Sequence, residues 1–211
     1  SKASATDTIL VNGGVQEIDA GGSATSTTVS SGGSLQVGEG GFLSGATVSS
    51  GGELTVNELT GSSTTVADAT ILSGGSLVIT GEGVTVTGLT LYDGAGLQLL
   101  SMDYASSGAQ QTTYSVSGNT LTVSGYDSDN NAITQSFSFA GTAGTITADE
   151  FSLVQTADGT TTVNYAACYC PGTLIATKDG EVPVEQLKIG DMIRTASGTL
   201  KKIRWIGHRS Y

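Results

Sequence analysis

The sequence predicts an all-β protein whose first part is a parallel β-helix, a solenoid in which each turn of chain, or coil, stacks on the previous one. Two observations support this class. A ten-residue pattern recurs at intervals close to nineteen residues, and a pair of glycines stands at the same place in nearly every copy. A period near twenty residues with alternating apolar β-formers is typical of a solenoid. Leucine-rich repeats share this period, but they need several leucines and a helical segment in each unit, which these copies lack.

Five coils are expected, from Ile9–Ile18, Thr28–Val37, Thr47–Val56, Thr70–Ile79 and Thr90–Leu99. Alternate apolar residues should point inward and stack on their counterparts in the next coil, one strand spacing of about 4.8 Å away. In the two clearest copies these residues are Val29, Leu35, Val37, Val48, Leu54 and Val56.

The recurring glycine pair should turn the chain at the same corner of every coil, because glycine adopts positive φ without steric cost. The corner residues are expected to be Gly13, Gly14, Gly32, Gly33, Gly51, Gly52, Gly74 and Gly75. A second corner is marked by Gly21-Gly22 and Gly40-Gly41 and is lost in the later, longer coils. Residues 1 to about 7 are expected to be a disordered lead-in.

Residues 101–167 lose the period but stay rich in β-formers, and we expect them to cap the repeat domain of residues 1–100, whose strand edges would otherwise be exposed. Hairpins are indicated at Ser117-Gly118-Asn119 and Asp158-Gly159, and a further turn at Asp127–Asn131. The last turn has oxygen ligands suited to calcium. It lacks the glycine and the distant glutamate of a calcium-binding hand, so a hairpin turn explains it better.

Charge is distributed unevenly along the chain. Between Ala3 and Ala167 there are 15 Asp and Glu and no Lys, Arg, His or Cys, whereas residues 168–211 carry seven Lys and Arg and four acids. This change places a domain boundary near residue 167. An acidic surface without basic residues excludes nucleic acid as a partner of the first part. The missing His and Cys exclude catalytic triads and Cys nucleophiles there, and we expect no metal and no cofactor. No apolar run reaches the length of a membrane span.

The third region, residues 168–211, holds a dense set of motifs: Cys168–Thr177, Gly180–Asp191 and Ile203–Gly207. They resemble the front third of a bacterial hedgehog/intein (Hint) domain, which carries a Cys, an aromatic residue and Gly-Thr, then Val-Glu-x-Leu-x-x-Gly-Asp and Ile-x-Trp-x-Gly. The resemblance implies a self-processing reaction. Cys168 would be the nucleophile and Ala167–Cys168 the scissile bond.

The Hint family also uses a Thr-x-x-His element, whereas the one histidine here, His208, has no Thr three residues before it. We therefore expect an incomplete segment that is inactive by itself. Cys170 is expected to be structural. Trp205 is expected to lie in the core.

The repeats of residues 8–100, with Thr-Val-x-Ser-Gly-Gly-x-Leu-x-Val followed by x-Gly-Gly, resemble the passenger repeats of AIDA-type autotransporter adhesins. The resemblance implies a protein that is secreted or displayed on the bacterial cell surface. Its partners would be cell-surface glycans or like molecules on neighbouring cells.

Two other functions of the solenoid are open. A carbohydrate-active β-helix, either a polysaccharide lyase or a hydrolase, needs acids that converge. The acids are instead scattered: Glu17, Glu39, Glu53, Asp68 and Glu82. Glu39 and Glu58 are expected at one corner of neighbouring coils, on a solvated edge. Ice binding needs a ladder of Thr-x-Thr, and only residues 85–87 and 120–122 fit, in different regions.

Overall fold

The computed structural model describes residues 3–58, 63–141, 146–165, 173–195 and 198–207. The chain divides into two compact units, residues 1–167 and 168–211, and each is described by itself. The described residues of the first unit form nineteen strands joined in one hydrogen-bonded system, and most of these strands pair in parallel. This confirms the expected fold class, a parallel β-solenoid of about five coils with a β-rich cap.

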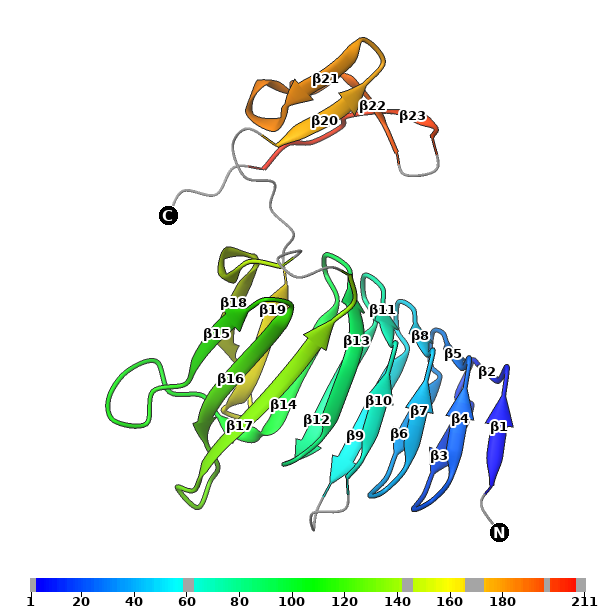
Figure 1. The fold of residues 1–211 in the computed structure, drawn as a ribbon, viewed down its shortest axis with the longest axis vertical. Helices are drawn as coiled ribbons and strands as arrows, with labels where there is room; N and C mark the ends of the chain where they lie inside the picture. The colour runs from blue at the N-terminus through cyan, green and yellow to red at the C-terminus, as the bar shows by residue number, and fades with distance from the viewer. Residues whose placement is uncertain (1–2, 59–62, 142–145, 166–172, 196–197, 208–211) are drawn as a thin grey trace. The chain divides into compact units, whose positions relative to one another are not determined.

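Coils 1 to 4 each have three short strands, coil 5 has two longer ones, and strands on the same side of successive coils pair in parallel (Figure 1). Face 1 contains β1 (Ser4–Thr6), β4 (Ser23–Thr25), β7 (Phe42–Ser44), β10 (Thr65–Ala67) and the first part of β13 (Thr85–Leu91). Face 2 contains β2 (Ile9–Leu10), β5 (Thr28–Val29), β8 (Thr47–Val48), β11 (Thr70–Ile71) and the second part of β13. Face 3 contains β3 (Val15–Ile18), β6 (Ser34–Val37), β9 (Glu53–Glu58), β12 (Ser76–Gly81) and β14 (Gly96–Asp103). Coil 1 thus comprises β1 to β3, and each later coil the next strands of the three faces.

The expected disordered lead-in is wrong for Ser4–Thr6, because β1 pairs in register with β4. Ser4-Ala5-Thr6 repeats Ser23-Ala24-Thr25 at the nineteen-residue period. A match of three small residues is too short to be recognised as a strand without the pairing that the structure provides.

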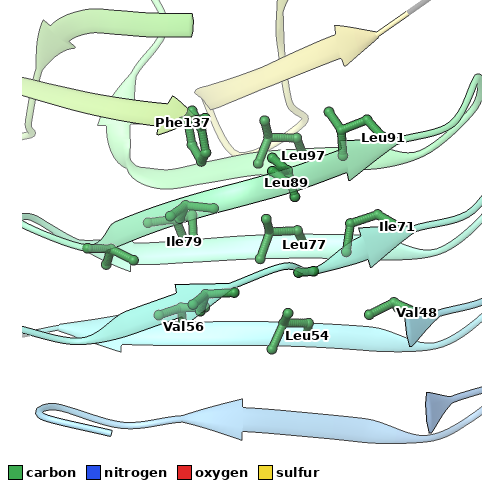
Figure 2. Close-up of a cluster of buried hydrophobic side chains, with 14 of the residues drawn as sticks. Val48, Leu54, Val56, Ile71, Leu77, Ile79, Leu89, Leu91, Leu97 and Phe137 are labelled. Atoms are coloured by element: carbon green, nitrogen blue, oxygen red, sulfur yellow. The ribbon is translucent and has the colours of Figure 1, made fainter. Parts of the chain in front are cut away.

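The register stacks apolar side chains into columns along the solenoid axis. Leu54 pairs with Leu77, and Leu77 with Leu97, and all three are fully buried. Figure 2 shows this column beside the one formed by Val48, Ile71 and Leu91. The six residues expected to point inward in the two clearest copies are all fully buried, as predicted. Burying each such side chain contributes roughly 1.5–3 kcal/mol.

The corner between faces 2 and 3 is a column of left-handed glycines, Gly13, Gly32, Gly51, Gly74 and Gly94, with φ from +74° to +86°. The amide of each of the first four donates to the carbonyl of the next glycine in the column, at 2.7–2.9 Å. The second glycine of the pair has a different role. A Cβ on Gly33, Gly52 or Gly75 would lie 2.5–2.7 Å from a carbonyl oxygen of the preceding coil. Coil 5 has Ala95 there, so the first position is the stricter one.

A third corner, between faces 1 and 2, was missed by the sequence analysis. Asp7, Ser26, Gly45, Asp68 and Gly88 all have φ between +52° and +69°. The amides of the first four each donate to a carbonyl of the next coil. The available signal was a small or Asp residue recurring at the repeat period, which the mixture of three residue types concealed.

The cap contains β15 (Thr113–Ser117), β16 (Thr120–Tyr126), β17 (Ala132–Phe139), the 3₁₀ turn η1 (Ala148–Glu150), β18 (Phe151–Gln155) and β19 (Thr160–Tyr165). β17 extends face 1 parallel to β13, and β19 extends face 3 antiparallel to β14. The hairpins expected at residues 117–119 and 158–159 are both present. Phe139, Phe151 and Tyr165 pack together with ring centroids 5.3–6.5 Å apart. The cap therefore covers strand edges of coil 5, as predicted.

The second unit is a small antiparallel sheet with strand order β21-β20-β22-β23. Its elements are β20 (Leu174–Thr177), β21 (Gly180–Pro183), the 3₁₀ turn η2 (Val184–Gln186), β22 (Met192–Arg194) and β23 (Leu200–Lys202). No helix in the described part of the chain is long and apolar enough to cross a membrane.

Gly51→Ala should lower the free energy of unfolding by about 1–2 kcal/mol, because an L-residue pays that much for left-handed backbone. The new Cβ would also lie 3.1 Å from Ser31 Oγ. Urea unfolding followed by circular dichroism measures the loss. Ser50→Ala, at the exposed neighbouring position, should change the value by less than about 0.5 kcal/mol. Equal losses in the two variants would contradict the role given to Gly51.

Thr161→Val should raise the free energy of unfolding by about 1 kcal/mol. The Thr161 side chain is fully buried and its hydroxyl has no hydrogen-bond partner among the described residues. Valine keeps the shape and removes the unsatisfied polar group. The matched control is Thr162→Val, where the side chain is half-buried, and thermal and urea unfolding of both variants give the comparison. A destabilised Thr161→Val variant would show that the hydroxyl is satisfied in solution.

Candidate functional site

The outward side of the solenoid carries hydroxyl groups in columns. On face 2, Thr28, Thr47, Thr70 and Thr90 pair in register and are half-buried. On face 1, Thr25 and Thr6 are hydrogen-bonded through their hydroxyls at 3.2 Å. No strand of faces 1 and 2 contains a charged residue. The strands of the two faces therefore form a hydrogen-bonding surface that repeats at the spacing of the coils, and the corner between the faces carries the exposed acids Asp7 and Asp68.

The acids of the solenoid lie on face 3 and at the corners. Glu17 pairs with Gln36, and Glu53 pairs with Ser34 and Ser76, so these two acids belong to different columns. Asp68 lies at the third corner, and Glu82 is exposed after β12. The described residues contain no group of three or more His, Cys, Asp or Glu that could hold a metal ion. Glu17, Glu53 and Asp68 thus lie in separate columns and corners.

The expectation of a solvated Glu58 is wrong, because this side chain is 2% exposed. Glu58 Oε2 accepts a hydrogen bond from the backbone amide of Thr64 at 2.8 Å. Thr64 is buried too, and its hydroxyl oxygen accepts from the amide of Gly40 at 3.1 Å. Gly21 and Gly40 begin the column of this second corner, and Glu58 and Thr64 end it. At this point the sequence of the coil is longer and the glycine pair is lost.

The Asp127–Asn131 segment is a hairpin turn between β16 and β17. The side-chain amide of Asn131 and the amides of Asn131 and Asp129 donate to the two carboxylate oxygens of Asp127. These hydrogen bonds, that of the Asn131 side chain above all, lower the pKa of Asp127. The carboxylate is therefore used inside the turn, as the hairpin interpretation expects.

The motifs of the second unit form its turns. The motif Gly180–Asp191 ends in a Gly-Asp pair. Its glycine, Gly190, has φ +108°, and the amide of Gly190 donates a hydrogen bond to the carbonyl of Ile203. A carboxylate oxygen of Asp191 accepts from the amide of Lys188 at 2.8 Å. Thr177 closes the β20–β21 turn, since its hydroxyl donates to the carbonyl of Gly180 at 2.7 Å. The spaced motif residues are thus those that fix the turns of a small sheet.

None of the described side chains of residues 173–207 is fully buried. Leu174 is 56% exposed and Ile189 65% exposed. The expectation that Trp205 lies in the core is wrong in this structure, because its side chain is 78% exposed. In the described part of this unit, no second layer of structure packs on the sheet, and these apolar side chains therefore stay exposed.

The expected nucleophile Cys168, the Ala167–Cys168 bond, Cys170 and His208 lie outside the described residues. The boundary between the two compact units falls between Ala167 and Cys168, at the expected scissile bond. The last strand of the first unit, β19, ends at Tyr165. All strands of the solenoid and its cap therefore precede that bond.

Two family models match the chain. Residues 1–52 match the adhesin of the bacterial autotransporter system, probable stalk (AIDA), and residues 167–211 match the Hint domain. The first match covers coils 1 and 2 and reaches the glycine corner of coil 3. No curated protein and no solved structure matches the chain. The chain thus carries a stalk repeat of the AIDA autotransporter family at its N-terminus and a Hint domain in residues 167–211.

Proposed function

We propose that the first unit is a surface-displayed or secreted bacterial adhesion module, and that the Hint domain processes the chain at the end of this module. The observation that carries the proposal is the hydroxyl-rich surface of faces 1 and 2, which has no charged strand residue over five coils. The stalk match of residues 1–52 supports placement outside the cell.

Cell-surface glycans, or like molecules on neighbouring cells, fit such a surface. Hydroxyl groups donate and accept hydrogen bonds, and strands without charged residues have no ion to desolvate on contact. The columns repeat from coil to coil, so a repetitive ligand meets the same groups several times. Weak contacts repeated in this way combine into a strong attachment.

The other candidate for the solenoid, a polysaccharide lyase or hydrolase, gains no support from the arrangement of acids. Glu17 and Glu53 lie in separate columns, and Glu58 is buried against Thr64. Catalysis by carboxylates needs two of them on either side of one bond. Adhesion requires no such convergence.

For the Hint domain we propose the reaction that its family implies. The Cys168 thiolate attacks the carbonyl carbon of Ala167, a carbon–sulfur bond forms, and the bond from that carbon to the Cys168 nitrogen breaks. The nitrogen takes a proton and becomes a free amine, while Ala167 is held as a thioester. Water or a second nucleophile then displaces the sulfur and releases residues 1–167. The Thr-x-x-His element that helps to break the amide is not found in residues 168–211, so this segment alone should not react.

Cells that display residues 1–167 should clump or bind a glycan-coated surface more than cells without the protein. A triple variant with Thr28→Lys, Thr47→Lys and Thr70→Lys puts charges on face 2. Its binding should fall at least about tenfold because the repeated contacts are removed. Flow cytometry and settling assays measure this. The control places the same number of lysines on face 3, with Gln36→Lys, Thr55→Lys and Gln98→Lys, and should keep binding. Display of the unchanged solenoid with no gain over empty cells would count against adhesion.

In a polypeptide whose Hint domain is complete, mass spectrometry should detect a fragment that ends at Ala167. Cys168→Ala should abolish this fragment because no thioester can form, whereas Cys170→Ala should leave it. Hydroxylamine should increase its release from the unchanged chain by attacking the thioester. Cleavage that persists in the Cys168→Ala variant would refute the assignment of the nucleophile.

A further inference from the structure

One strand of face 1 carries an aromatic residue where its neighbours carry hydroxyl groups. The first residues of the face 1 strands pair in register and form a column on the outside of the solenoid: Ser4, Ser23, Phe42, Thr65 and Thr85. The strands β4, β7 and β10 lie side by side there (Figure 1). The side chain of Phe42 is 42% exposed, and the described strands of faces 1 and 2 contain no other aromatic residue. Phe42 therefore places a single ring within a column of hydroxyl groups.

The fold does not need this ring. Ser23 in β4 and Thr65 in β10 take part in the same parallel pairing without one. Leu43, the next residue of β7, is fully buried and supplies the core contact of this strand. An exposed ring keeps apolar surface in water, which is unfavourable. Contact with a ligand accounts for Phe42, whereas folding does not.

Three hydroxyl side chains surround the ring. Ser23 and Thr65 lie in the strands on either side of Phe42, at a strand spacing of about 4.8 Å. Ser44 lies two residues further along β7, on the same side of the strand as Phe42. Within the described residues, none of these three hydroxyl groups forms a side-chain hydrogen bond. They can therefore bond to a ligand that covers the ring.

A pyranose sugar fits this arrangement. One side of such a sugar is lined by C–H groups that pack on the face of an aromatic ring, and its rim carries hydroxyl groups that donate and accept hydrogen bonds. An apolar peptide would also cover the ring. It would leave the surrounding hydroxyl groups desolvated and without partners, which costs free energy. The ring and the hydroxyl groups together therefore favour a sugar.

The charge of the first unit restricts the kind of sugar. Between Ala3 and Ala167 there are 15 carboxylates and no basic residue. A uronate or another acidic sugar would enter this negative field without a cation to pair with, whereas a neutral sugar is not repelled. The site therefore favours neutral over acidic glycans.

We propose that Phe42 is the centre of a subsite on face 1 for one neutral pyranose unit of a glycan. The sugar stacks its C–H side on the ring, and its hydroxyl groups exchange hydrogen bonds with Ser23, Ser44 and Thr65. This inference rests on the proposed adhesion function, and it names the class of the ligand and the residues of one contact.

The test is affinity electrophoresis of the full chain in gels that contain a neutral polysaccharide (hydroxyethyl cellulose, xyloglucan or mannan) or an acidic one (alginate). At least one neutral polymer should retard the unchanged chain, and alginate should not. Phe42→Ser gives β7 the residue that β4 has at this place. It should raise the apparent Kd at least about fivefold because the stacking contact is lost. Phe42→Trp keeps an aromatic face and should stay within about twofold of the unchanged chain.

Val15→Ser is the matched control. Val15 is an exposed apolar side chain on face 3, and the residue that pairs with it in coil 2 is Ser34. This variant removes an exposed apolar group of the solenoid without touching face 1, so it should be retarded as the unchanged chain is. Urea unfolding checks that both serine variants are folded.

Equal retardation of the Phe42→Ser variant and the unchanged chain would overturn the inference. Retardation by alginate alone, or by none of the polymers, would overturn it too. Failure of the adhesion proposal looks different. Displaying cells that attach equally well with and without Phe42→Ser would refute the sugar subsite and leave adhesion standing. Cells that do not attach, with a chain whose retardation depends on Phe42, would refute adhesion and leave the subsite standing.

Discussion

Stacking of each corner directly on the corner of the next coil is the constraint on which the rest of the solenoid depends. The strands of face 2 in coils 1 to 4 are only two residues long, so pairing along one face alone would not hold the register. Left-handed glycines that donate to one another down the column fix where every coil turns. A slip of one residue would turn the whole set of Leu and Val side chains from the core to solvent. The leucine column of face 3 is thus a consequence of the corners.

Growth of such a stack has to be ended, and the chain ends it with a change of strand direction. β19 runs antiparallel to β14. β17 pairs parallel with β13 on one side and antiparallel with β16 on the other, so the parallel pattern does not continue beyond these strands. Phe139, Phe151 and Tyr165 fill the space between these strands. The hydroxyl of Tyr114 donates to the carbonyl of Phe151 at 2.8 Å, which ties β15 to β18. Aromatic packing replaces the thin aliphatic columns where the repeat stops.

The sequence was sufficient for the features that repeat. Val29, Leu35 and the glycine pair recur at a constant interval, and the alternation of each copy determines which side chains face inward. The predictions that failed concern features that occur only once or that depend on pairing partners. Ser4–Thr6 has too few residues to be recognised as a strand. The buried position of Glu58 depends on its hydrogen bond from the amide of Thr64, a contact that the other described coils do not repeat. The exposure of Trp205 depends on what surrounds a small sheet, and a local motif contains no information about that.

The solenoid and its cap contain carboxylates without a single basic partner between Ala3 and Ala167. Attraction between opposite charges therefore contributes nothing to holding these coils together, and dissolved ions have no favourable pair to weaken. They can only screen the repulsion among fifteen like charges. Concentrated brine should thus leave this fold at least as stable as dilute buffer, which is the opposite of the behaviour of proteins held by surface ion pairs.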